Sequence, residues 1–169
     1  MATTGSFPTG EVAIVGAFES PRRRAPGSHA FDIHAEVVIG ALADAGLELG
    51  DVDGFCTAAG FPAEEAWAMC IVELADYLGI TPAWFDSTDT GGCAYITHAG
   101  HAAMAIAQGH IDVALVTCAA LARSTPLDAP DFNSNETGPG QWEVPYGFST
   151  VAGYALTAQR HLHEYGTTR

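Results

Sequence analysis

The sequence predicts an α/β domain in which a mostly parallel sheet carries helices on both faces. Four short apolar runs alternate with three longer stretches whose apolar residues recur every three or four positions. Strands that alternate with helices in this way are joined by right-handed crossovers and run parallel. The 169 residues, 48% hydrophobic and 15% charged, suffice for one domain with a substantial core, so we expect residues 1–169 to form a single domain.

The first β-α-β unit is predicted from the opening residues. Residues 11–17 (EVAIVGA) form a β-branched apolar run typical of a buried strand. Residues 31–45 have helical periodicity, and Gly46 follows as a C-terminal stop. A second strand is predicted at 53–59, and the next amphipathic helix at 63–78.

The pattern then repeats before it disappears. We expect a third strand at 83–88, a helix at about 93–107 and a fourth strand at 111–119. Residues 120–149 are rich in Pro, Gly, Asn, Asp, Ser and Thr, which predicts a long functional or interface loop. A last helix is predicted at 150–165.

The helix at 93–107 is unusual because no Asp, Glu, Lys or Arg occurs between Asp89 and Asp112. A helix that covers one face of a sheet should carry charge on its outer side. We therefore expect this helix to be buried all round, beneath a second layer that one sheet cannot supply. Without that layer the chain would expose a large apolar patch. A membrane span is disfavoured because the helix is nearer about 15 than about 20 residues long and contains His98 and His101.

Charge and cysteine content exclude several classes of function. The net charge of −14 would repel nucleic acid, and the absence of lysine excludes a lysine Schiff base. The N-terminus has no basic region before its apolar run, so we expect a cytoplasmic protein. The cysteines form no C-x-x-C pair, which argues against zinc and disulfides and favours free thiols: Cys56, Cys70, Cys93 and Cys118. His98 and His101 share a helical face but lack a third ligand nearby, so no metal site is predicted.

The sequence TDTGGCAYITH places a cysteine at a predicted strand-to-helix turn. Cys93 follows Gly91 and Gly92 and is expected to be the first helical residue. A helix N-terminus favours a thiolate, and backbone N–H groups there can hold a developing oxyanion. Cys93 is therefore the candidate nucleophile, with Gly91 and Gly92 as candidate oxyanion or substrate-binding residues. The alternative is that Cys93 is a buried small hydrophobic residue.

Two long stretches resemble the sterol-carrier-protein branch of the thiolase superfamily. They are GGCAYITHAGHAAMAIAQGHIDVALV and PYGFSTVAGYALTAQRHLHEYGTT. The opening VAIVGAFESP and the passage ADAGLELGDVDGF resemble the family's first β-α-β unit, so the resemblance covers essentially the whole chain. The family has two β-α-β-α-β-α-β-β halves that sandwich a central pair of helices. The resemblance implies that this chain is the N-terminal half and that the C-terminal half, with its histidine in a G-H-P-like turn and its second cysteine, is absent.

The resemblance leaves the reaction open. In the family, the nucleophilic cysteine begins the central helix. Ile106 and Gly109 match the family's I-x-x-G motif, and counting back from them places the position of that cysteine on Gly92, one residue before Cys93. One implied function is a thiolase-like acyl-CoA C-acyltransferase of lipid or sterol side-chain metabolism, in which Cys93 attacks. The alternative is a thiolase-like retro-aldol lyase that acts on a hydroxyacyl-CoA with a small OB-fold partner. A third is a non-catalytic scaffold subunit.

The resemblance also implies a ligand and partners. The substrate would be an acyl-CoA thioester, with no permanently bound cofactor, and the protein would be a homodimer. Arg22, Arg23 and Arg24 follow the first predicted strand and could meet the CoA phosphates, unless they form an ordinary solvated loop. Tyr146 in VPYG is a candidate for lining the substrate site from the long loop.

Overall fold

The computed structural model describes residues 8–58, 70–121, 124, 140–143, 146 and 150–168. The chain divides into two compact units, Met1–Thr125 and Pro126–Arg169, and each is described by itself. Part of the helix predicted at 63–78 and most of the loop predicted at 120–149 lie outside the described residues.

The first unit is built on a parallel sheet. Its described strands are β1 (Gly54–Cys56), β2 (Trp84–Asp86) and β3 (Ala114–Val116), in the spatial order β2-β1-β3. Phe55, at the centre of β1, is in register with Phe85 on one side and Leu115 on the other. All three strands lie within predicted ones. Because they are parallel, their carboxyl ends meet at one edge of the sheet.

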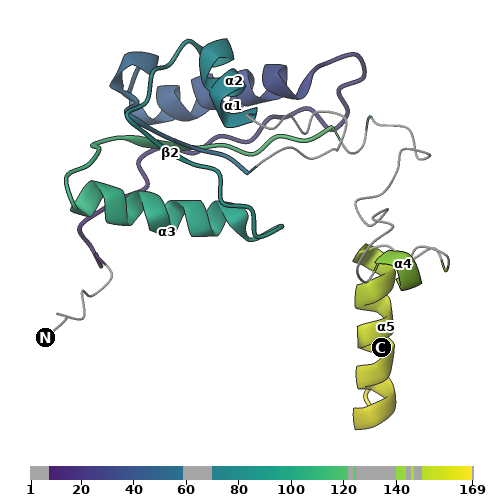
Figure 1. The fold of residues 1–169 in the computed structure, drawn as a ribbon. Helices are drawn as coiled ribbons and strands as arrows, with labels where there is room; N and C mark the ends of the chain where they lie inside the picture. The colour runs from purple at the N-terminus through teal and green to yellow at the C-terminus, as the bar shows by residue number, and fades with distance from the viewer. Residues whose placement is uncertain are drawn as a thin grey trace, which may run out of the picture. The chain divides into compact units, whose positions relative to one another are not determined.

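Helices cover both faces of this sheet, as predicted. Helices α1 (Ala30–Ala45) and α2 (Cys70–Leu78) lie on one face, and α3 (Ala94–Ala107) lies on the other (Figure 1). A short 3-10 helix, Leu49–Asp51, connects α1 to β1. The core forms where α1 and α2 meet the sheet, around Val38, Leu42, Val52, Phe55, Leu74, Ala75, Ile80 and Leu115. The predicted α/β class is therefore confirmed.

Helix α1 has sequence signals at both ends. His29 accepts a hydrogen bond from the N–H of Phe31, and Asp32 accepts one from the N–H of His29 at 2.8 Å, so the side chains satisfy N–H groups of the first turn. Gly46 ends the helix with φ of 70°, a left-handed conformation that glycine adopts without strain. The stop predicted at Gly46 is confirmed.

The strand predicted at 11–17 is wrong: none of these residues forms a strand, and the segment is not part of the sheet. β1 and β3 hydrogen-bond directly to each other, which leaves no gap for another strand between them. The segment packs on α1 instead, so closely that a Cβ atom at Gly16 would lie 2.9 Å from Cβ of Ala45. Ile14 is left 87% exposed.

Helix α3 is buried on its sheet side only. Ala94 and His98 are fully buried, and Ala102 and Ala105 are almost fully buried, at 5% and 6% exposed. Ile96, on the outer side, is 78% exposed. The chain therefore exposes apolar surface on α3, as predicted for a chain without a second layer. The described part of the chain contains no helix long and apolar enough to cross a membrane.

The second unit contains two helices among its described residues, α4 (Gly140–Glu143) and α5 (Thr150–Tyr165). Helix α5 has the bounds expected from the sequence. Helix α4 falls inside the region predicted to be a loop. Four residues are too few to show helical periodicity, which explains why the sequence pattern missed it.

Candidate functional site

The turn between β2 and α3 is braced by two aspartates. Oδ1 of Asp86, the last residue of β2, accepts hydrogen bonds from the backbone N–H of Thr88 at 2.9 Å and from its hydroxyl at 2.7 Å. Oδ1 of Asp89 accepts one from the N–H of Gly91 at 2.8 Å. Gly91 has φ of 69°, a conformation that a side chain would strain. The turn predicted from the two glycines is thus a defined structure at the carboxyl edge of the sheet.

The sequence predicted that Cys93 is the first helical residue, but in the structure it is the N-cap of α3. Its side chain is exposed, and its Sγ donates a hydrogen bond to the carbonyl of Thr90 at 3.1 Å. It accepts no capping hydrogen bond. Cys93 is therefore accessible to a reactant and not buried as a small hydrophobic residue.

His98 and His101 both support this turn. Nε2 of the buried His98 bonds the carbonyl oxygen of Thr88 at 2.9 Å, while its Nδ1 has no hydrogen-bond partner among the described residues. Nδ1 of His101 lies 2.6 Å from Oδ2 of Asp86. Burial alone would raise the pKa of Asp86, but the hydrogen bonds from Thr88 and His101 outweigh it and hold that pKa below its usual range. No group of three metal-ligating side chains occurs within the described ranges.

Cys56 differs from Cys93 in its environment. It lies in β1 with no exposed surface. Burial, and secondarily the charge of Asp86, raises the pKa of its thiol to about 12. At neutral pH Cys56 is thus a protonated core residue, whereas Cys93 and Cys118 are the exposed thiols among the three cysteine side chains that the structure describes.

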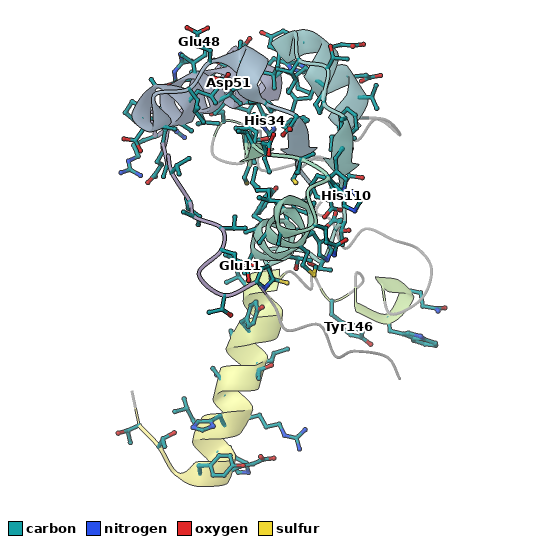
Figure 2. All side chains as sticks on the ribbon, turned by 90° about the vertical axis from the view of Figure 1, so that its left-hand side faces the viewer. Glu11, His34, Glu48, Asp51, His110 and Tyr146 are labelled. Carbon is teal, nitrogen blue, oxygen red and sulfur yellow. The ribbon has the colours of Figure 1, made fainter. Side chains whose placement is uncertain are left out.

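The predicted phosphate-binding arginines also lie near the carboxyl edge of the sheet. Arg22, Arg23 and Arg24 line one pocket together with residues that follow β3. Tyr146 belongs to the second unit, where its side chain is 89% exposed (Figure 2). Its role in lining the substrate site, like the roles of Gly91, Gly92 and the arginines, stays a prediction.

A buried polar cluster at the same edge was missed by the sequence analysis. His34 of α1 lies between that helix and the sheet (Figure 2), and its Nδ1 is 3.0 Å from Oγ1 of Thr117, just beyond β3. The hydroxyl of Thr57, just beyond β1, donates to the carbonyl of Thr117 at 3.0 Å. Burial lowers the pKa of His34 to about 4. The signal was present, because His34 lies four residues before the core residue Val38 on the same helical face.

Three proteins similar in sequence indicate the family. The chain is 33% identical over 95% of its length to the 17-hydroxy-3-oxo-4-pregnene-20-carboxyl-CoA lyase of Mycobacterium tuberculosis (strain ATCC 25618 / H37Rv), of which it covers 42%. It is 30% identical over 94% of its length to the steroid side-chain-cleaving aldolase of Thermomonospora curvata, covering 41%. It is 29% identical over 94% to the acetyl-CoA acetyltransferase of Methanothermobacter thermautotrophicus, covering 41%. No protein-family model matches the sequence.

A solved structure shows the same likeness in three dimensions. The Ltp2-ChsH2(DUF35) aldolase superposes with a TM-score of 0.66 and 32% identity, over 84% of this chain and 35% of that one. The chain thus spans less than half the length of the relatives it matches. In both sequence and fold, the homologues of this chain are thiolase-like proteins, and the chain matches a partial region of them.

Proposed function

We propose that this chain is part of a thiolase-like carbon–carbon lyase that acts on a hydroxyacyl-CoA in lipid or steroid side-chain metabolism. The observation that carries the proposal is the likeness to the Ltp2-ChsH2(DUF35) aldolase over 84% of the chain. Two relatives at 30% identity or more are also named as a lyase and an aldolase. The family's nucleophile register on Gly92 rather than Cys93 further supports cleavage without a covalent intermediate.

The reaction would be a retro-aldol cleavage. A base removes the proton of the substrate hydroxyl, and the carbon–carbon bond breaks to leave a carbonyl group on one product. The bonding electrons pass to the carbon beside the thioester carbonyl, giving an enolate that is then protonated to a shortened acyl-CoA. The start of α3, with the N–H groups of Gly92 and Cys93 at its positive end, suits the enolate oxygen.

Acyl transfer is the second candidate, and the exposure of Cys93 at the N-cap of α3 favours it. In that reaction the Cys93 thiolate attacks the thioester carbonyl, the CoA thiolate leaves, and an acyl-cysteine forms. The acyl group then passes to a second substrate.

Replacement of Cys93 separates the two candidates. In the intact enzyme we expect Cys93→Ala to keep turnover of a hydroxyacyl-CoA within about threefold of wild type, because no bond to sulfur is needed. Cys118→Ala is the matched control, because it removes the second thiol that is exposed among the cysteine side chains the structure describes. A loss of about a hundredfold or more in Cys93→Ala alone, with an acyl adduct on Cys93 detected by mass spectrometry, would contradict the lyase and establish the transferase.

The proposal also covers the assembly of the enzyme and its location in the cell. The outer face of α3 is exposed in this chain, which supports a second protein layer against it. We include in the proposal a homodimer, a small OB-fold partner and a cytoplasmic location. The partner is supported by the name of the similar solved structure, the Ltp2-ChsH2(DUF35) aldolase, because that name gives two components.

A further inference from the structure

An apolar slot lies beside the outer edge of β3. Its volume is about 630 Å³, and residues 11–16 and 112–116 form its two side walls. Helix α1 lines one face of the slot, and α3 lines the other. The helical lining includes Ala41, Leu42, Ala45, Ala99, Ala103 and Ile106. A molecule in this slot would therefore lie in the layer of the sheet, with an apolar helix surface on each face.

The wall formed by β3 has backbone groups that lack a partner strand. This strand lies at one end of the described strand order, so only one of its sides is paired. The carbonyl of Val113 accepts a hydrogen bond from the N–H of Gly54 at 3.0 Å and so faces β1. Because successive residues of a strand turn their N–H and C=O groups to opposite sides, those of Ala114 and Val116 face the slot. They match a ligand that offers backbone groups at the spacing of a strand.

Residues 11–16 form the opposite wall and run in the direction of β3. Gly16 lies against Ala45, in the last turn of α1. Further along, the hydroxyl of Ser20 donates to Glu36, in the second turn of that helix. The segment thus runs antiparallel to α1, which starts at the carboxyl edge of the sheet. Both walls of the slot therefore run toward the carboxyl edge, so a strand between them can pair with each.

The sequence of residues 11–16 suits strand pairing. Residues 12–15 read VAIV, yet Ile14 is 87% exposed and Val15 is 63% exposed. The backbone of residues 12–16 makes no hydrogen bond with any residue that the structure describes. A strand in the slot would pair with this backbone and bury part of this apolar surface. It would also account for the strand-like composition of a segment that forms no strand here.

The slot has the size of a short strand. A strand rises about 3.3 Å per residue, its neighbours lie about 4.8 Å away, and packed layers are about 10 Å apart, so each residue fills about 160 Å³. The volume of about 630 Å³ therefore holds about four residues. The wall strand β3 has three residues, so the slot and its wall agree in length.

The lining sets the chemistry of the occupant. Because both faces are apolar, the occupant needs a continuous apolar run rather than an alternation of apolar and polar residues. Glu11 and Asp112 stand at the start of the two walls, and both are exposed. Two carboxylates at one end of the slot favour a basic residue there. The net charge of −14 on the chain favours a basic partner as well.

We propose that this slot binds a β-strand of a second polypeptide, one with about four consecutive apolar residues beside a basic residue. The strand pairs with β3 on one side and with residues 11–16 on the other. It lies within the sheet, so its site is separate from the outer face of α3, where the second protein layer is expected. The inference does not depend on the reaction proposed above.

Titration of the 169-residue chain into a fluorescently labelled synthetic peptide tests the slot by anisotropy. The peptide has four alternating valine and alanine residues in its centre, with a serine and an arginine at each end. We expect saturable binding that weakens about tenfold when one central backbone nitrogen is methylated, because a hydrogen-bond donor is lost while the side chains stay. Glutamate in place of both arginines should weaken binding about fivefold, because it meets the carboxylates of Glu11 and Asp112.

Filling the slot supplies a variant that stays folded. Ala103→Leu places a larger apolar side chain in the slot, so it should weaken peptide binding about tenfold or more while the midpoint of urea unfolding stays equal or rises. Ala43→Leu makes the same substitution at an exposed position of α1 and should change the affinity less than about twofold.

A charge variant leaves the apolar lining intact. Glu11→Gln removes one carboxylate from the end of the slot, so it should weaken binding of the arginine-flanked peptide about threefold. Glu73→Gln removes an exposed carboxylate from α2 and is the matched control. It should leave the affinity within about 1.5-fold of wild type.

Each alternative occupant has its own result. Equal binding of the methylated and unmethylated peptides would overturn the proposal, because it would show adsorption to apolar surface without strand pairing. Equal losses in Ala103→Leu and Ala43→Leu would overturn it too. Oleate binding that Ala103→Leu abolishes, without peptide binding, would place a lipid in the slot. Self-association of the chain that the peptide reverses would place a second copy there, and either result would contradict a strand from a separate polypeptide.

Discussion

His34 is the buried ionisable residue with the clearest consequence for stability. Its side chain is 6% exposed and contacts the hydroxyl of Thr117. In the folded chain its pKa is lowered from 6.5 to about 4 because burial disfavours the charged form. The unfolded chain therefore takes up a proton at this residue at a higher pH than the folded chain does.

The sign of the pH effect follows from this difference. Between about pH 6.5 and pH 4 the unfolded state binds more protons, so stability falls as the pH falls through that window. We expect His34 to contribute about 3 kcal/mol to the free energy of unfolding at pH 7 relative to pH 4. Urea unfolding at a series of pH values measures this contribution as the difference between wild type and His34→Gln, which carries no charge at either pH.

An exposed histidine provides the control. His110→Gln makes the same substitution at a histidine that is exposed at the surface (Figure 2), so it shows how much of any change comes from replacing a histidine as such. If His34→Gln loses as much stability as wild type between pH 7 and pH 4, the burial of a neutral His34 is wrong. Carboxylates such as Asp86, whose pKa is lowered, change the stability at lower pH than His34 does, and they do so equally in wild type and in His34→Gln.

At the scale of elements, the contact between residues 11–17 and α1 is specified by small residues. A Cβ atom at Gly16 would overlap the carbonyl oxygen of Ala41 and lie 2.9 Å from Cβ of Ala45. Because backbone atoms cannot move aside easily, we expect Gly16→Ala to lower the free energy of unfolding by about 1–3 kcal/mol. Thermal or urea unfolding measures the loss.

Gly50→Ala is the matched control for this contact. A Cβ atom at Gly50 would meet nothing within 4 Å, and its backbone has no positive φ. We expect its stability to lie within about 0.5 kcal/mol of wild type. Equal stabilities of Gly16→Ala and Gly50→Ala would show that residues 11–17 do not rest on α1 in solution.

At the scale of the whole molecule, the outer face of α3 is an exposed apolar surface. Ile96 is 78% exposed and Met104 39%, on a helix without a charged residue. Apolar surface of this kind drives association. We expect the 169-residue chain to self-associate with rising concentration in sedimentation velocity, and Ile96→Glu to shift the distribution toward the monomer.

A variant on the opposite face separates this surface from general solubility. Val72 of α2 is 42% exposed on the other side of the sheet, so Val72→Glu makes the same change of charge away from α3. We expect it to sediment like wild type. Equal effects of the two variants would show that net charge, not the α3 surface, governs association.

The sequence by itself determined the elements whose signals are local. Apolar periodicity and terminal glycines located α1, α3 and α5, and the alternation of strands and helices predicted a parallel sheet. The glycine pair before Cys93 marked the turn after β2, because a left-handed residue there requires glycine. These features depend on residues close together in the chain, so a local pattern is enough to find them.

Only the tertiary structure decided which segments meet. It paired β1 with β3 and left residues 11–17 against α1, although that segment has the composition of a buried strand. It brought His34 to Thr117, 83 residues away, and Ser124 to Ala25, 99 residues away. Such contacts arise from the packing of helices on the sheet, where burial and hydrogen bonding act between residues whose spacing in the sequence carries no signal.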